Sequence, residues 1–283
     1  MTLFNKTISS TGIEIASIGI GTWEVGGRFI RDYRNDESQI EALRKAVGMG
    51  FSHIDTAEVY GNGHAEEIVA EAVKGYNRKD IFITSKVWSK NLDYTSLLKS
   101  AEQSLKRLKS DYFDLYLIHA PNNQIQLKET MKAMSRLVDE KTTRWIGVSN
   151  FNVSQMKEAQ YYCNHKVAAN QLEYNLTNRN KGTLNLNVEK EIYPYCLEND
   201  ILFIAWRPLA KGVITKLTNP LLLNLSKKYN KTITQLAINW LVSKKNIVTI
   251  PKATQINHLE EIKNSLGWSM DANDYLLLDN FAI

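Results

Sequence analysis

The chain lacks most of the features that mark secreted, membrane or disulfide-stabilised proteins. Its 283 residues include only two cysteines, Cys163 and Cys196, which lie too far apart to form a metal-binding or redox motif. Two separate thiols favour a reducing compartment over a disulfide framework. No apolar stretch is long enough to cross a bilayer, and the segment Met1–Lys6 lacks the apolar core of a signal peptide. We therefore expect a cytoplasmic protein without a membrane partner.

No block of basic residues points to a nucleic-acid partner. The 35 lysines and arginines are interspersed with 30 acidic residues, for a formal net charge of +5, so we expect no nucleic-acid binding. His53, His64 and His165 have no Asp, Glu or Cys partner at ligand spacing on one element, so no metal site is expected. The sequence instead favours a monomer with a small-molecule substrate, and its mildly positive field would suit an anionic cofactor.

Eight short apolar runs alternate with segments of helical spacing between about residues 18 and 263. The runs are Ile18–Gly21, Phe51–Ile54, Ile81–Thr84, Leu115–Ile118, Trp145–Val148, Val167–Asn170, Ile201–Ala205 and Ile247–Ile250. Between the runs, apolar residues recur every three or four positions, as at Leu98, Ala101, Leu105 and Leu108. This alternation is typical of a parallel sheet with crossover helices.

The alternation fits either a barrel or an open doubly wound sheet. The dinucleotide-binding form of the open sheet carries GxGxxG after its first strand, and Gly19, Gly21, Gly26 and Gly27 do not have that spacing. A length of 283 residues suits one (β/α)₈ barrel, for which about 250 residues is typical. We therefore predict an α/β fold, a TIM barrel, with residues 1–283 forming a single domain.

Three kinds of segment lie outside the alternating pattern. Residues Thr7–Ile15, around Ser10-Thr11-Gly12, predict a β-hairpin that could plug the lower end of the barrel. The polar stretches Glu173–Glu189 and Leu209–Thr232 are expected to be loops over the mouth, because loops of that length are usually functional or mobile. Only a short tail, Ser265–Ile283, follows the last expected helix.

Four side chains that can take part in acid–base chemistry follow neighbouring apolar runs. They are Asp55, Tyr60, Lys86 and His119. Taken singly, they could be a helix cap, a rim aromatic, a snorkelling lysine and a structural histidine. In a barrel, however, the carboxyl ends of the strands meet at the mouth where such folds place their chemistry, so the four are expected to gather there.

Together these groups could protonate a substrate oxygen. A free tyrosine, with a pKa of about 10, is a weak acid at neutral pH, and the cation of Lys86 is expected to lower the pKa of Tyr60. Asp55 can keep Lys86 protonated, and His119 can hydrogen-bond the substrate oxygen. A general acid of this kind typically contributes about 10²–10⁴-fold in rate.

Three strings in the sequence resemble the aldo-keto reductase superfamily. They are GFSHIDTAEVYG at 50–61, IGVSNF at 146–151 and NQLEY at 170–174, and the resemblance extends from Gly19 to Lys252. It implies a TIM barrel that binds NAD(P)H across its mouth without a Rossmann domain. It also implies an oxidoreductase that reduces aldehydes and ketones to alcohols by hydride transfer.

The resemblance assigns roles to individual residues. Tyr60 is the expected proton donor, Lys86 and Asp55 are its tuning pair, and His119 orients the carbonyl. Ser149, Asn150 and Gln171 are expected to hold the nicotinamide carboxamide. Trp206 stands where the family usually has a tyrosine that stacks on the nicotinamide. Arg207 could reach the pyrophosphate or, equally, form a surface salt bridge.

The same resemblance places the 2′-phosphate site of the cofactor after the last strand. Lys252 matches the phosphate-binding lysine, whereas Ala253 replaces a serine and His258 stands where an arginine is frequent. Because Lys252 and Thr254 remain, we predict that NADPH is preferred and NADH tolerated. Further cofactor contacts are expected at Thr22, Leu209 and Glu261.

The substrate pocket is expected to be roomy. The resemblance places Trp23 and Trp88 on its wall, and Ala120 stands where a tryptophan frequently follows the histidine. The tail after Leu266 lacks the long loop that narrows the pocket in many relatives. These features predict broad specificity and modest affinity.

Two other functions remain compatible with the residues. Lys86 could act as a Schiff-base nucleophile on the same barrel, although this would not explain the matches at Ser149, Asn150 and Gln171. Alternatively, the chain could be a cofactor-binding regulatory subunit, as some members of the superfamily are.

Overall fold

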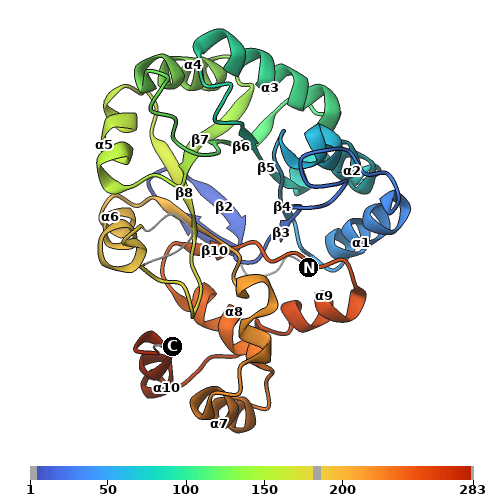
Figure 1. The fold of residues 1–283 in the computed structure, drawn as a ribbon, viewed down its shortest axis with the longest axis vertical. Coiled ribbons are helices and arrows are strands. Elements are labelled where there is room, and N and C mark those ends of the chain that lie inside the picture. The colour runs from blue at the N-terminus through green and yellow to red at the C-terminus, as the bar shows by residue number, and fades with distance from the viewer. Residues whose placement is uncertain (1–4, 181–185, 282–283) are drawn as a thin grey trace.

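Eight parallel strands form a closed barrel in the computed structural model, which describes residues 5–180 and 186–281 (Figure 1). The strands are β3 (Ile20–Gly21), β4 (His53–Asp55), β5 (Phe82–Val87), β6 (Phe113–Ile118), β7 (Thr143–Ser149), β8 (Val167–Glu173), β9 (Leu202–Trp206) and β10 (Ile247–Thr249). Each pairs with its neighbours in chain order. A parallel bridge between Ile18 and Thr249 closes the ring. All eight apolar runs supply barrel strands, as predicted.

Helices surround the barrel and cover its outer face (Figure 1). Between or after the strands lie α1 (Asp36–Gly48), α2 (His64–Val73), α3 (Tyr94–Leu108), α4 (Leu127–Asp139), α5 (Val153–Tyr161), α6 (Tyr193–Glu198), α8 (Ile233–Ser243) and α9 (Ile256–Lys263). Their buried faces carry the residues spaced three and four apart, such as Leu97, Ala101 and Leu108 in α3. The α/β class, the TIM barrel and the crossover helices are therefore confirmed.

The predicted hairpin closes one end of the barrel. Strands β1 (Asn5–Ile8) and β2 (Ile13–Ala16) pair antiparallel, and Figure 1 shows β2 crossing the middle of the ring. Ile8, Ile13 and Ile15 are buried and pack in one cluster with side chains of the barrel interior, among them Phe82, Leu115, Ala168, Leu202 and Val248. The hairpin thus fills the end of the barrel at which the strands begin.

The stretch Leu209–Thr232 is not simply a loop, contrary to the expectation. It contains α7 (Pro220–Tyr229), where Pro220 occupies the first turn and the side chain of Asn219 accepts a hydrogen bond from the amide of Leu221 at 2.9 Å. Leu222 and Leu225 bury the apolar side of this helix. A capped start and an apolar stripe therefore outweigh the polar composition of the surrounding stretch.

The described residues include part of the other expected loop and most of the tail. Of the stretch Glu173–Glu189, residues 181–185 lie outside the described residues, and Asn175 and Asn178 form an isolated antiparallel bridge. The tail forms α10 (Ala272–Asp279), which is held to α8 because the Trp240 indole donates to Asp279 Oδ1 at 2.7 Å.

Candidate active site

The four acid–base side chains meet at the carboxyl ends of β4, β5 and β6. Lys86 Nζ lies 2.6 Å from Asp55 Oδ1, donates to the Thr56 carbonyl at 2.8 Å and lies 3.4 Å from Tyr60 Oη. The rings of Tyr60 and His119 stand edge to face, with centroids 5.6 Å apart. Lys86 is fully buried, so its charge acts on the neighbouring side chains, Asp55, Tyr60 and His119, with little screening by solvent.

A tight turn after β4 places the phenol of Tyr60. Gly61 and Asn62 both have positive φ, at 54° and 51°, and the turn leads directly into α2. The amide of Gly61 donates to the Arg28 carbonyl at 3.0 Å. A Cβ at Gly61 would lie only 2.3 Å from the Gly26 carbonyl oxygen, so a side chain there has no room. Glycine at 61 is therefore required for the turn that aims Tyr60 into the mouth.

The electrostatics of the phenol differ from the prediction. Burial raises the pKa of Tyr60 above its ordinary value of 10, and although Lys86 lowers it, the opposing effect of burial is larger. The expected net lowering of the Tyr60 pKa is therefore wrong in this structure. Tyr60 stays protonated at neutral pH, with an ammonium beside it that would stabilise the phenolate.

The protonation states of Lys86 and His119 follow from burial and charge. Burial alone would lower the pKa of Lys86, but the Asp55 carboxylate raises it above its ordinary value, as predicted. Burial, together with the charge of Lys86, lowers the pKa of His119 to about 3. At neutral pH the site thus contains a neutral imidazole, a neutral phenol and a paired ammonium.

Three amide and hydroxyl side chains lie on the adjoining strand ends. Gln171 donates from Nε2 to Asp55 Oδ2 at 2.7 Å, and Ser149 donates to the Gln171 carbonyl at 2.9 Å. Asn150 has a positive φ of 65° and donates to the His119 carbonyl at 3.0 Å. Its Oδ1 is buried and lacks a hydrogen-bond partner among the described residues. A buried acceptor without a partner is costly, so this oxygen fits the NH₂ group of a carboxamide.

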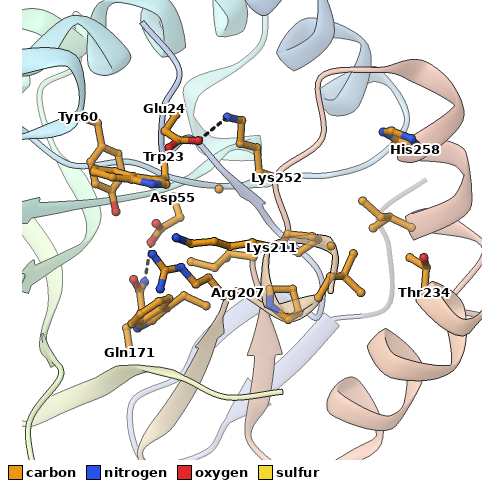
Figure 2. A pocket seen from close by; sticks show the side chains of 18 of the residues that line it. Trp23, Glu24, Asp55, Tyr60, Gln171, Arg207, Lys211, Thr234, Lys252 and His258 are labelled. Carbon is orange, nitrogen blue, oxygen red and sulfur yellow. Dashed lines mark hydrogen bonds and ion pairs between the residues drawn. The ribbon is translucent and has the colours of Figure 1, made fainter. Parts of the chain in front are cut away.

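A large cavity extends from these residues across the mouth. Its volume is about 1100 Å³, slightly above the roughly 300–1,000 Å³ of ordinary small-molecule sites, so there is room for an elongated ligand. Figure 2 shows Tyr60 and Trp23 at one end and His258 and Thr234 at the other. The cavity lining combines apolar walls with a few polar groups, as ligand sites do.

Most of the residues predicted for the site line this cavity. They are Trp23, Asp55, Tyr60, His119, Ser149, Asn150, Gln171, Trp206, Arg207, Leu209, Lys252, His258 and Glu261. Five are not among the lining residues: Thr22, Lys86, Trp88, Ala253 and Thr254. Thr22 is buried and donates to the Asp55 carbonyl at 3.0 Å, so it supports the end of β4.

Charged groups also line the cavity beyond the catalytic end. The Arg207 guanidinium stacks over the Trp206 ring at 4.7 Å and lies 3.6 Å from Glu173 Oε1. On the opposite side, Lys252 Nζ lies 3.6 Å from Glu24 Oε2 (Figure 2). The side chain of Lys252 is only about one-third exposed, at 37 %. The cavity therefore contains positive groups that suit an anionic ligand.

The sequence interpretation missed several lining residues. Glu24 and Phe29 come from the segment between β3 and α1, Lys211 from the segment after β9, and Thr234 from the start of α8. Glu24 and Phe29 belong to a stretch without periodicity, and the only signal there is the pair of glycines at 26 and 27. Within the described ranges, no group of three or more His, Cys, Asp or Glu side chains could hold a metal ion.

Comparison with known proteins identifies the family. The model of the "Aldo/keto reductase family" matches residues 17–283. Methylglyoxal reductase YeaE of Escherichia coli K12 is 32% identical over 282 residues, which cover 97% of this chain and 94% of that protein.

Solved structures give the same result. The crystal structure of a thermostable aldo-keto reductase, Tm1743, with the inhibitor epalrestat superposes with a TM-score of 0.92 at 39% identity, covering 99% of this chain and 100% of that one. An aldo-keto reductase from Klebsiella pneumoniae in complex with NADPH has a TM-score of 0.83 at 30% identity, covering 98% and 95%. No helix among the described residues is long and apolar enough to span a membrane. The barrel, the residues at its mouth and the match over residues 17–283 show that the chain belongs to the aldo/keto reductase family.

Proposed function

We propose that this protein reduces aldehydes and ketones to alcohols with NADPH and that Tyr60 donates the proton. The observation that carries the proposal is the contact between Tyr60 Oη and Lys86 Nζ at 3.4 Å, with Lys86 held at 2.6 Å by Asp55. This geometry places a protonated phenol at the cavity and a buried cation directly behind it.

The residues would act on a substrate carbonyl in distinct ways. When bound, NADPH supplies the hydride, which no side chain can deliver. The carbonyl oxygen would lie between Tyr60 Oη and the ring of His119, whose neutral imidazole carries one N–H to position it. Tyr60 transfers its proton to that oxygen, and Lys86 stabilises the phenolate that remains. Asp55 keeps Lys86 charged, so it too is needed although it does not touch the substrate.

The cofactor would lie along the cavity from the catalytic end towards His258. Ser149, Asn150 and Gln171 would hold the nicotinamide carboxamide, and the Asn150 Oδ1 that lacks a partner supports this assignment. Trp206 offers a flat face for the nicotinamide ring and lines the cavity. Arg207 and Leu209 would contact the central part of the cofactor.

Preference for NADPH would depend on the residues between the middle of the cavity and its far end. Lys252 and His258 line it and would contact the 2′-phosphate, with Thr254 and Ala253 on the same segment. Glu24, which pairs with Lys252, would weaken the attraction for that phosphate. NADPH is therefore preferred and NADH tolerated. Thr22 and Glu261 complete the expected contacts, with Glu261 Oε1 accepting from Thr232 Oγ1 at 2.6 Å.

The substrates we propose are small carbonyl compounds, including the methylglyoxal for which the Escherichia coli relative is named. Trp23 supplies an apolar wall next to Tyr60, since the two rings stand edge to face at 5.0 Å. Trp88 does not line the cavity but contacts Phe29, which does. Lys86 as a Schiff-base nucleophile is less well supported, because its amine is fully buried and paired with Asp55.

Residues 1–283 are proposed to act as one domain, as a monomer, in the cytoplasm. Cys163 and Cys196 are both free and buried, which suits a reducing compartment. Size-exclusion chromatography with light scattering would test the monomer, since a mass of twice 32.3 kDa would contradict it.

The function is tested by following the absorbance of the reduced nicotinamide with methylglyoxal, benzaldehyde and a simple ketone. We expect turnover with NADPH, and slower turnover with NADH through a higher KM. No consumption of either cofactor with any carbonyl, despite tight NADPH binding, would contradict the proposal and support a regulatory subunit. A lower KM for NADH than for NADPH would contradict the cofactor preference.

A further inference from the structure

A row of four aromatic side chains begins at Tyr60 and leads away from it. The centroids of Trp23 and Tyr60 lie 5.0 Å apart, those of Trp23 and Phe29 lie 5.4 Å apart, and those of Phe29 and Trp88 lie 5.9 Å apart. All three pairs have edge-to-face geometry. Through Trp23, the row thus connects Tyr60, the proposed proton donor, to Phe29 on the segment between β3 and α1.

Phe29 is the most exposed member of this row. It lines the cavity together with Trp23, and 54% of its surface is exposed, whereas Trp88 is not a lining residue. Trp23 and Phe29 are in contact and both line the cavity, and adjoining exposed apolar groups are typical of a binding surface. The Phe29 ring has no polar atom, so a ligand can interact with it only through apolar or aromatic groups.

The segment that carries Phe29 is fixed to the barrel on both sides of the ring. Before it, the Arg28 carbonyl accepts a hydrogen bond from the Gly61 amide at 3.0 Å. After it, Arg31 donates two hydrogen bonds of 2.9 Å to Glu67 on α2. Because both flanks are anchored, the ring is held in place before a substrate arrives, which reduces the entropy lost on binding.

The Gly26-Gly27 pair allows the segment to turn so sharply. Gly27 has a φ of +105°, and a Cβ there would lie 2.0 Å from the Ile30 carbonyl oxygen. The amide of Asp32 donates back to the Gly26 carbonyl at 2.9 Å, which closes the turn around Phe29. The position of the ring is therefore set by backbone geometry as well as by side-chain contacts.

The cavity near the catalytic end also leaves volume for a bulky group. Ala120 follows His119 and lines the cavity, and its side chain is only a methyl group. A substrate whose carbonyl lies at Tyr60 can therefore carry a ring without meeting a large side chain at position 120. Trp23 and Phe29 then offer adjacent apolar faces to that ring.

We propose that Phe29 is a specificity-determining residue that selects carbonyl compounds with an aryl group, by forming with Trp23 the outer wall of the substrate site. This inference rests on the proposed carbonyl reduction. An aryl ring next to Phe29 would adopt the edge-to-face or offset arrangement that aromatic pairs favour. A substrate as small as methylglyoxal has no group that extends to Phe29 and gains nothing from it.

The test compares Phe29→Ala with the wild type on benzaldehyde and methylglyoxal, both with NADPH. For benzaldehyde we expect kcat/KM to fall about tenfold, mainly through a higher KM. For methylglyoxal we expect kcat/KM to stay within twofold, and the Kd for NADPH to be unchanged. Phe29→Tyr, which keeps an aromatic ring, should retain benzaldehyde activity.

Ile30→Ala is the matched control. Ile30 is the next residue, is 80% exposed and does not line the cavity. Its truncation should therefore change kcat/KM for neither benzaldehyde nor methylglyoxal. If Phe29→Ala does not fold, Phe29→Leu replaces it, with the same selective loss expected because the aromatic face is missing.

Two outcomes separate this inference from the proposed function. Suppose that the wild type reduces both aldehydes. If Phe29→Ala then lowers kcat/KM equally for the two aldehydes, or lowers it for neither, the assignment of Phe29 is wrong and carbonyl reduction stands. If the wild type reduces no carbonyl compound, the proposed function fails and this inference fails with it.

Discussion

At the scale of single residues, burial and the charges of neighbouring groups together decide the protonation states in the barrel. Tyr60, Lys86 and His119 lie within one small volume, and each has a pKa displaced by burial together with the charge of a neighbour. The catalytic proposal depends on this arrangement, because a proton donor must keep its proton until the carbonyl arrives. The raised pKa of Tyr60 meets that requirement, and in this proposal Lys86 would stabilise the phenolate that remains.

His53 provides a test of burial that does not involve the reaction. It is fully buried inside the barrel on β4, its Nε2 is 3.0 Å from Thr84 Oγ1, and burial lowers its pKa to about 3. In the unfolded chain its pKa returns to about 6.5. Between these pH values the unfolded state binds one more proton at His53 than the folded state does. The free energy of unfolding is therefore not reduced by His53 above pH 6.5, and it falls as the pH drops from 6.5 towards 3.

We therefore predict that His53→Gln flattens the pH dependence of stability. The slope of the free energy of unfolding between about pH 4 and pH 6 should decrease by up to about 1.4 kcal/mol per pH unit, the contribution of one proton. Urea unfolding at several pH values measures it. An identical slope in the variant and the wild type would show that His53 is not held neutral by the fold.

At the scale of elements, turns with positive φ place the reactive groups. Gly61 lies in the turn that positions Tyr60, and Asn150 has a positive φ directly after β7. Glycine and asparagine adopt this conformation at lower cost than other residues. The local sequence thus encodes the strand ends and the direction of the side chains that follow them.

Gly61→Ala should damage catalysis more than stability alone would explain. Its Cβ would lie 2.3 Å from the Gly26 carbonyl oxygen, which shifts both Tyr60 and the segment that carries Phe29. In the NADPH assay we expect kcat to fall at least tenfold. In thermal unfolding we expect a lower Tm.

Gly12→Ala is the control for backbone strain. Gly12 lies in the hairpin turn with a φ of +70°, and no atom lies within 4 Å of its Cβ position. This variant should lose about 1–2 kcal/mol of stability and keep its kcat. Equal losses of kcat in the two variants would contradict the role of the Gly61 turn.

At the scale of the whole molecule, the chemistry and the stability of the barrel lie at opposite ends. The hairpin β1–β2 packs against the interior where the strands begin, and the cavity lies where they end. TIM barrels commonly separate stability and activity in this way. Changes at the hairpin should therefore affect unfolding without altering the reaction.

Ile13→Ala tests this separation. Ile13 is fully buried in the cluster between hairpin and barrel, and loss of such a side chain typically costs about 2–5 kcal/mol. We expect urea unfolding to show that loss while kcat of the folded variant stays within twofold. Glu14→Ala, an exposed change on the same strand, should alter stability by less than about 0.5 kcal/mol. A large loss of kcat in Ile13→Ala would contradict the separation.

The sequence predicted the architecture because its signals are local and periodic. Short apolar runs followed by Asp55, Lys86 or His119 mark strand ends without knowledge of tertiary contacts. The helix α7 was missed because its polar surroundings hide its apolar stripe. Phe29 was missed because its segment lacks periodicity and is held by distant partners such as Glu67. The raised pKa of Tyr60 depends on the depth of its burial, which spacing in the sequence does not indicate.

The most direct measurement is carbonyl reduction by Tyr60→Phe. This change removes only the hydroxyl and leaves the ring that packs against Trp23. We predict that kcat falls at least about 100-fold, in line with the loss of a general acid, while the Kd for NADPH measured by quenching of tryptophan fluorescence stays within twofold. An undiminished rate of reduction by Tyr60→Phe would contradict the assignment of Tyr60 as the proton donor.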